Sequence, residues 1–107
     1  MSVTVVAQYR VDSENVATVR EALRKMVAPS RAEPGCLAYD VYVDPRDDSL
    51  VVLVERYVDD SAFQAHLNSG HFDTLVRGTV LPRLSDRVRF DLVPLDDLDD
   101  ADSARRD

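Results

Sequence analysis

Alternating apolar positions mark four segments of the chain as β-strands. The first is Val3–Val11, in which every odd-numbered residue is apolar. Similar patterns predict strands at Leu37–Val43, Leu50–Val58 and Arg87–Val93. A period of two places the apolar side chains of a strand on one face. Because the link Asp44–Asp48 between the second and third strands is short, these two strands are expected to form an antiparallel hairpin.

Helical spacing appears in the gap between the first and second strands. Asp12 and Ser13 are candidate helix caps. The apolar stripe that follows them consists of Val16, Val19, Leu23, Met26 and Val27. We expect this helix to end near Pro29, because the residue before a proline disfavours α geometry. The Glu33-Pro34-Gly35 sequence then predicts a turn into the second strand.

A second helical region lies between the third and fourth strands. A short stripe that follows Asp59, Asp60 and Ser61 contains Ala62, Phe63, His66 and Leu67. Asn68–Gly70 interrupts this stripe, and a second one starts at Phe72. Pro82 should kink or shorten the end of the second helix.

The resulting order, β-α-β-β-α-β, predicts a ferredoxin-like α+β fold. In this arrangement the helices cover one face of an antiparallel sheet. The run LVVLVE, Leu50–Glu55, is apolar on both faces, as in strands that are buried on both sides. Two sheets packed face to face would cover the second face, so we expect a two-fold symmetric homodimer.

The 107 residues are expected to form one domain, residues 1–94, followed by an acidic tail, residues 95–107. The tail has almost no apolar residues and is predicted to be disordered. Its six aspartates and two arginines contribute −4 to the net charge of −7. The acidic domain has no basic stripe, which argues against nucleic acid and anionic membrane surfaces as partners.

Expectations about the cellular location and the cofactors of the protein rest mainly on sequence motifs that do not occur. No run approaches the roughly 18 apolar residues of a membrane span, and the N-terminus does not resemble a signal peptide, so we expect a cytoplasmic protein. No glycine-rich nucleotide-binding motif or nucleophile elbow occurs, and we expect no cofactor. The single cysteine, Cys36, excludes an internal disulfide, and two histidines five residues apart are a weak metal signal. We therefore predict no metal site.

Two polar residues on apolar faces are the main candidates for chemistry. Glu55 shares a strand face with Leu53 and Tyr57, where a carboxylate is costly to bury unless it is paired or protonated. His66 lies one turn after Ala62 on the stripe that should face the core. Each residue alone is more often structural. Together, they can form an acid–base pair between sheet and helix.

Further candidates surround this pair. His71 opens the second helical stripe, where it can cap the helix or contact a ligand. Five aromatic residues can line a cavity for a flat ring, although each alone is more often part of the core: Tyr39, Tyr42, Tyr57, Phe63 and Phe72.

Two motifs resemble the antibiotic biosynthesis monooxygenase (ABM) domain family. Glu33–Pro45 resembles its EPGCLxYxxxxDP segment. Glu55–Tyr57 followed by Ala62–Phe72 resembles its second signature, E-x-[WY] and then A-x-x-x-H-x-x-[ST]-x-H-[FY]. The resemblance extends over roughly Val3 to Val93. It implies a dimeric α+β barrel, in agreement with the strand and helix pattern.

The resemblance also implies a choice of reactions. The family includes cofactor-independent monooxygenases of polyketide quinones, quinol monooxygenases, haem-degrading enzymes and an isomerase of a phosphorylated signal breakdown product. A deprotonated hydroquinone or phenol can pass an electron directly to O₂, so the protein needs only to bind the ring, remove a proton and exclude water. In this interpretation His66 accepts the proton and Glu55 orients it or acts as a second acid–base group.

The remaining site residues also take roles from the resemblance. Tyr57, Phe63 and Phe72 would pack against the ring, His71 would support or bind the substrate, and Tyr39 would line the cavity. The chain has no tryptophan, and Tyr9 replaces the asparagine of the haem degraders, which argues against haem degradation. The first helix lacks the histidine of the isomerases.

Three hypotheses remain open from the sequence. The first is a monooxygenase that oxidises a quinol or polyphenolic ring with O₂. The second is an isomerase of a small carbonyl compound that uses the same Glu55–His66 pair for proton transfer. The third is a non-catalytic dimeric binding module in which the histidines are structural.

Overall fold

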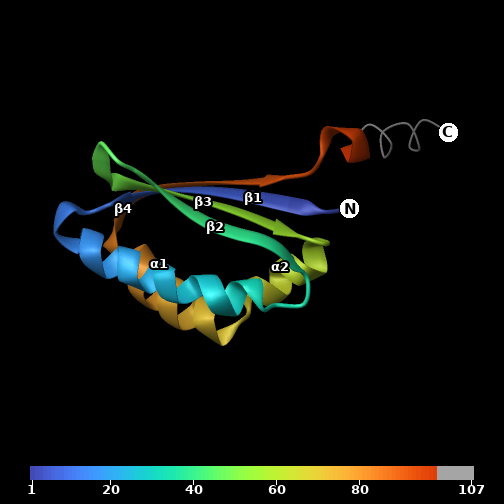
Figure 1. Ribbon diagram of the computed structural model, residues 1–107, viewed down its shortest axis with the longest axis horizontal. Coiled ribbons are helices and arrows are strands. Elements are labelled where there is room, and N and C mark those ends of the chain that lie inside the picture. The colour runs from blue at the N-terminus through green and yellow to red at the C-terminus, as the bar shows by residue number, and fades with distance from the viewer. Residues whose placement is uncertain (99–107) are drawn as a thin grey trace.

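The computed structural model describes residues 1–98. In chain order its elements are β1 (Val3–Val11), η1 (Ser13–Asn15), α1 (Val16–Arg31), β2 (Cys36–Asp44), β3 (Asp47–Tyr57), α2 (Asp60–Leu67), η2 (Phe72–Val80), η3 (Leu81–Arg83) and β4 (Leu84–Leu92). The four strands form one antiparallel sheet in the order β2-β3-β1-β4 (Figure 1). This topology confirms the predicted ferredoxin-like α+β fold.

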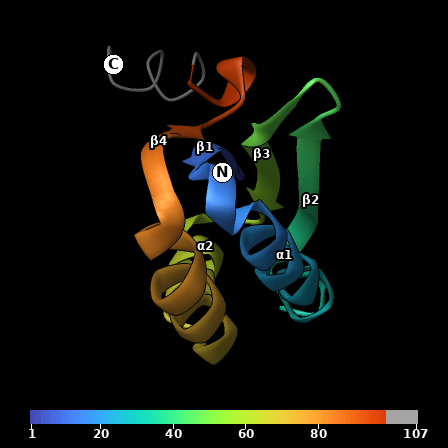
Figure 2. The ribbon, with the colours of Figure 1, turned by 90° about the vertical axis from the view of Figure 1, so that its left-hand side faces the viewer.

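The helices that connect the strands all lie on one face of the sheet (Figures 1 and 2). The core fills the space between the two layers, because the inward-facing residues of β1 and β3 alternate with outward-facing ones as the period of two predicts. Val5 of β1 and Tyr39 of β2 are the register partners of Glu55 on either side of β3. The strand register therefore fixes Glu55 in the middle of the covered face.

The end of α1 differs from the sequence prediction. The helix continues through Pro29 and ends at Arg31, two residues later than expected. Proline costs one hydrogen bond in the last turn, but other contacts hold that turn. The Ala32 N–H donates to the Ala28 carbonyl, and the Arg31 side chain donates to the Tyr39 carbonyl and to Asp40 on β2. Tertiary contacts thus extend the helix beyond the local signal.

The α2–η2 junction follows the predicted interruption. The Asp59 side chain accepts a hydrogen bond from the Ala62 N–H and caps α2. At the break, Ser69 Oγ donates to the His66 carbonyl and accepts from the Phe72 N–H. One hydroxyl thus joins the end of α2 to the beginning of η2, which sets the spacing between the two histidines.

The opposite face of the sheet is uncovered and apolar. Its side chains come from all four strands, and the largest exposed ones are Tyr42, Val88, Phe90 and Leu92. Val52 and Val54 lie between them and are half-buried. This arrangement agrees with the two-sided apolar pattern that the sequence shows in β3.

Beyond β4 the chain leaves the sheet. Residues 95–98 form one helical turn, in which the Leu98 N–H donates to the Pro94 carbonyl. Residues 99–107, which make up the rest of the predicted disordered tail, lie outside the described residues. Within the described part of the chain, no helix is long and apolar enough to cross a membrane.

Candidate active site

Glu55 is a buried carboxylate with one strong hydrogen bond. Glu55 is 6% exposed to solvent. Its Oε1 accepts a hydrogen bond of 2.5 Å from the Tyr57 hydroxyl, two residues along the same strand face. Burial raises the pKa of Glu55 above its ordinary value, and the Tyr57 hydrogen bond and the nearby His66 oppose this shift only in part. A raised pKa makes this carboxylate a stronger base than an ordinary exposed one.

His66 extends from α2 into the core and lies between two carboxylates. Its Nδ1 is 2.8 Å from Glu33 Oε2 and 3.2 Å from Glu33 Oε1. Its Nε2 is 3.6 Å from Glu55 Oε1, which is beyond hydrogen-bond distance. An ionised carboxylate only accepts hydrogen bonds, so Nδ1 must carry the proton that binds Glu33. In the neutral tautomer with its proton on Nδ1, the Nε2 lone pair is directed toward Glu55.

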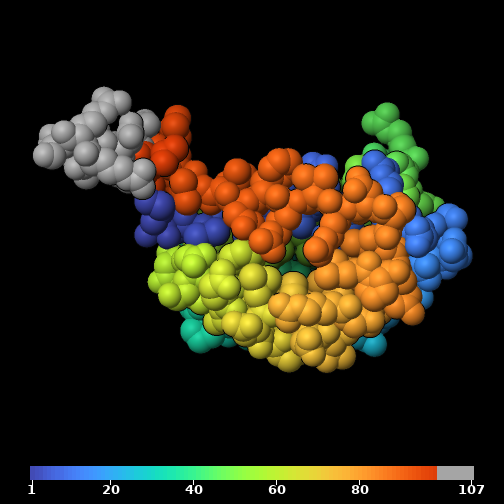
Figure 3. All heavy atoms as spheres, turned by 180° about the vertical axis from the view of Figure 1, so that it is seen from behind, coloured from blue at the N-terminus to red at the C-terminus, as the bar shows by residue number. Residues whose placement is uncertain are grey.

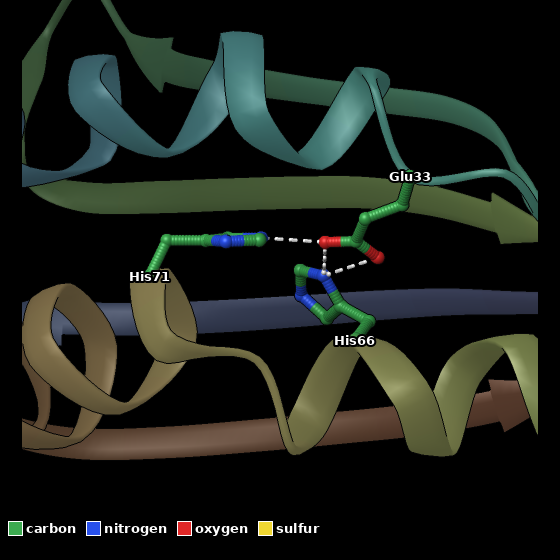
Figure 4. Close-up of side chains that lie close together, drawn as sticks. All are labelled: Glu33, His66 and His71. Atoms are coloured by element: carbon green, nitrogen blue, oxygen red, sulfur yellow. Dashed lines mark hydrogen bonds and ion pairs between the residues drawn. The ribbon is translucent and has the colours of Figure 1, made fainter.

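Glu33 also binds the second histidine. The His71 Nε2 is 2.6 Å from the same Oε2 atom that His66 contacts. Figure 4 shows both imidazole rings converging on this single carboxylate, which comes from the turn between α1 and β2. Glu33 is 16% exposed and His71 23% exposed, whereas His66 is 1% exposed. The cluster therefore extends from the core to the surface.

The sequence interpretation missed Glu33 as a site residue and assigned it only to the Pro-Gly turn. The structure explains how that turn reaches α2. A Cβ atom added to Gly35 would collide with the Ala62 side chain, so only glycine allows the turn to approach the helix this closely. One signal in the sequence could have identified it: Glu33 is the first residue of the EPGCLxYxxxxDP motif.

A cavity of about 210 Å³ lies between β1, β4 and the α2–η2 region. Figure 3 shows its opening as the hollow between the orange atoms of β4 and the yellow atoms below them. Its lining consists of Val5, Ala7, Tyr9, Glu55, Phe63, Leu67, Phe72, Arg87, Val88 and Arg89. Of the residues proposed from sequence, Glu55, Phe63 and Phe72 line it.

The other proposed residues do not line it. Tyr42 was expected in the cavity, but it is exposed on the open face of the sheet, because its position in β2 directs it away from the helices. The remaining four lie behind the lining. Tyr39 and Tyr57 are fully buried, and their ring centroids are 5.6 Å and 5.3 Å from that of His66. Burial raises the pKa of both phenols, which keeps them neutral. His66 and His71 lie on the Glu33 side. The structure thus places Glu55 and His66 side by side, but of these two residues only Glu55 lines the cavity.

Known proteins resemble this chain in both sequence and structure. The family model of antibiotic biosynthesis monooxygenase matches residues 2–78. The chain belongs to this family. "Putative monooxygenase Rv0793" from Mycobacterium tuberculosis is 36% identical over 70 residues, which are 65% of this chain and 68% of the relative.

Solved structures of similar sequence and fold support the same assignment. The Rv0793 structure has a TM-score of 0.82 at 32% identity, covering 89% of this chain and 96% of that one. PA3566 from Pseudomonas aeruginosa has a TM-score of 0.80 at 34% identity, covering 88% and 94%. A crystal structure described as an antibiotic biosynthesis monooxygenase has a TM-score of 0.81 at 30% identity, covering 87% and 98%.

The ABM family match contains the whole Glu33–His66–His71 cluster and Glu55 but ends before β4. Two cavity-lining arginines lie beyond it. Arg89 lies 5.4 Å from the Phe63 ring centroid and pairs with Asp91, and Arg87 lies two residues away on the same strand face. Sequence reasoning missed both arginines, although their spacing of two predicts a shared face.

Tyr9 is another cavity residue that sequence reasoning did not place in the site. It lies on β1, between Arg87 of β4 and Val51 of β3. Burial and the nearby Glu55 raise the pKa of Tyr9 to about 12, and the two arginines lower it in part. Its hydroxyl therefore stays protonated at neutral pH, so a ligand in the cavity meets neutral Tyr9, acidic Glu55 and two cations.

Proposed function

We infer that this ABM-family chain is a cofactor-independent monooxygenase that oxidises a quinol or related phenolic ring with O₂. Family membership and relatives named as monooxygenases support a monooxygenase-type function. The observation that carries the finer proposal is the line of groups from Glu55 at the cavity through His66 to Glu33. Such a line can take a proton from a ring hydroxyl and hold it away from the substrate.

Proton removal begins at Glu55, the titratable acid of the cavity lining. Its raised pKa makes it a better base for a phenolic hydroxyl than an ordinary carboxylate. The Nε2 lone pair of His66, 3.6 Å behind, accepts the proton after a small approach. Glu33, bound to Nδ1, then faces an imidazolium and stabilises its charge. Glu55 therefore acts first, and His66 stores the proton.

The oxygen step needs no external reductant. The deprotonated ring passes an electron to O₂, and the two radicals combine to form a C–O bond and a ring hydroperoxide. Loss of water from that hydroperoxide leaves a hydroxyquinone. Hydroquinone plus O₂ thus gives hydroxyquinone plus water, and the ring supplies the electrons. The protein stabilises the ring anion and keeps bulk water from the intermediates.

Cavity size and charge point to a small, electron-rich ring. A cavity of about 150 Å³ accommodates benzene, so about 210 Å³ suits one substituted ring or two fused rings. Arg87 and Arg89 line the cavity and can supply a counter-charge to a ring oxygen anion. The Phe63 and Phe72 side chains provide apolar walls for the ring faces.

The proposal includes a homodimer. Tyr42, Val88, Phe90 and Leu92 leave the open sheet face apolar, and a second copy packed on it would bury these side chains, as the sequence pattern predicted. Sedimentation velocity of the purified chain measures this directly. A monomer at micromolar concentration would remove the dimer from the proposal without affecting the site.

An isomerase is the second candidate. Proton transfer next to a carbonyl can use the same Glu55–His66 pair, and the two arginines of the cavity suit a small anionic carbonyl compound. The two reactions differ in their use of O₂. A third possibility, a binding module, would need neither proton transfer nor O₂.

Oxygen uptake by chelator-treated protein tests these alternatives. We expect uptake with benzo- and naphthohydroquinones, much slower uptake with four-ring phenols, and loss of uptake in His66→Gln. The control is Glu21→Gln, a substitution of an exposed acid on α1, which should behave as the wild type. No uptake from any ring by folded protein would reject the oxygenase. Conversion of a small carbonyl compound without O₂ would then favour the isomerase.

A further inference from the structure

Glu33, His66 and His71 offer three potential metal ligands that converge from three segments of the chain. One carboxylate oxygen and the two imidazole nitrogens lie within 4.8 Å of one another. We propose that these residues bind a divalent transition-metal ion such as Zn²⁺, and that the bound ion inhibits turnover by occupying His66. The inhibitory half rests on the proposed function, whereas the binding half does not. The proposal differs from the sequence analysis, which predicted no metal site.

The donor set matches known metal chemistry. Two imidazoles and one carboxylate are the protein ligands of several catalytic zinc sites, which leave a fourth position for water. The same set suits other first-row divalent ions. Histidines five residues apart gave only a weak signal, because the third ligand, Glu33, lies 33 residues before His66 in the sequence. The turn at Gly35, packed on Ala62, brings it into range.

Metal binding requires an adjustment of the carboxylate, and of the two imidazole nitrogens, which lie within 4.8 Å of each other. Ligand atoms around a tetrahedral zinc at ~2.1 Å lie roughly 3.4 Å apart. Here the Glu33 Oε2 atom is 2.8 Å from His66 Nδ1 and 2.6 Å from His71 Nε2. The carboxylate must therefore retreat by less than about 1 Å, a distance that side-chain rotation covers. Glu33 lies in a turn and is partly exposed, so it can make this movement.

The residues behind His66 complete the site. Metal-binding histidines usually donate the other ring N–H to a carboxylate. A metal on Nδ1 would leave the His66 proton on Nε2, which faces Glu55 Oε1 at 3.6 Å. Tyr57 already holds that carboxylate in place. Nε2 would then donate a hydrogen bond, and it would no longer have a lone pair to accept the proton from Glu55. Metal binding and proton storage are therefore mutually exclusive.

The ion and the ring would enter from different sides. The cavity lining includes none of the three ligands. Glu33 and His71 are partly exposed, and they give solvent access on the other side of His66. Because the ion does not compete with the ring for space, we expect it to lower kcat while KM stays unchanged. A metal that bound in the cavity would instead raise KM.

Zinc titration of chelator-treated protein tests the binding half. With isothermal calorimetry, or competition against a chromophoric zinc indicator, we expect one ion per chain. Glu33→Gln and His71→Ala change partly exposed residues and should weaken binding by at least about tenfold. Glu21→Gln and Cys36→Ser are controls, because Cys36 lies next to the turn, and both should bind zinc like the wild type. Equal affinity in all five proteins, or loss of binding in Cys36→Ser, would overturn the site.

Turnover at rising zinc concentration tests the inhibitory half. We expect kcat to fall with the occupancy measured by titration, and His71→Ala to need at least about tenfold more zinc for the same inhibition. One bound ion with undiminished kcat would overturn this half. If no substrate is turned over at all, the proposed function fails while the binding result still stands, so the two failures are distinguishable.

Discussion

Glu33 and Glu55 lie on opposite sides of one histidine, and they differ in almost every other respect. Glu55 is fixed in the middle of the sheet, is buried and accepts a single hydrogen bond, from a phenol. Glu33 belongs to a turn, is partly exposed and accepts hydrogen bonds from two imidazoles. Burial raises the pKa of Glu55. Environment therefore gives two identical side chains different tasks, one as an exchangeable base at the cavity and the other as the hydrogen-bond partner of two histidines.

The largest effect is expected from Glu55→Gln. Glutamine keeps an oxygen for the Tyr57 hydroxyl but cannot accept a proton, so the base is lost while the packing remains. General-base removal typically costs roughly 100- to 10,000-fold in rate. Steady-state oxygen uptake should show a loss of this size in kcat. An active Glu55→Gln enzyme would make His66 the direct base, as the sequence alone suggested.

A smaller loss is expected from Glu33→Gln. The amide can still accept one hydrogen bond, but it no longer stabilises a charged His66. Carboxylates that orient metal-binding histidines contribute about 10- to 100-fold, and we expect a loss of similar size here. The measurement is kcat and KM for the same quinol, with the effect expected in kcat. If Glu33→Gln cost as much as Glu55→Gln, the division between a supporting partner and the exchangeable base would be wrong.

The position of the Glu33 turn can be tested through glycine. Gly35→Ala should destabilise the fold by about 1–3 kcal/mol, because the added methyl group collides with Ala62 and overpacks the contact. Gly70→Ala is the matched control, since nothing lies within 4 Å of its added Cβ. Urea unfolding measures both variants. Equal stability of the two would mean that the turn and α2 do not pack as closely as described.

The smallest effect concerns pH. Because the pKa of Glu55 is raised above its ordinary 4.5, the folded chain holds this proton more tightly than the unfolded chain. The resulting stability is present below pH 4.5 and is lost as the pH rises through the folded pKa. Glu55→Gln should therefore become more stable relative to wild type with rising pH. The slope is at most about 1.4 kcal/mol for each pH step between the unfolded and folded pKa values of Glu55.

Urea unfolding between about pH 4 and pH 8 measures this difference. Glu21→Gln, which changes an exposed acid, should show no such trend. A constant difference between Glu55→Gln and wild type across this range would mean that the carboxylate is ionised as easily in the folded chain as in the unfolded one.

Periodicity predicted most of the fold and half of the site. A period of two placed Glu55 on the buried face of β3, and helical spacing placed His66 on the buried face of α2, where the structure has both. The same local rules set the end of α1 too early, because they do not include the bonds from Arg31 to β2. Hydrophobic periodicity predicts which face of a strand or helix a residue occupies, and here it did so correctly for Glu55 and His66.

Contacts between distant segments could not be predicted in this way. The sequence by itself determined the order of elements, the burial of Glu55 and His66, the two-sided apolar strand and the family motifs. Only the tertiary structure decided that Glu33 holds both histidines, that His66 is 3.6 Å from Glu55, and that two arginines line the cavity. The reason is physical. Periodicity specifies direction from the backbone, whereas distance across the core depends on how closely a turn such as Gly35 can pack on a helix.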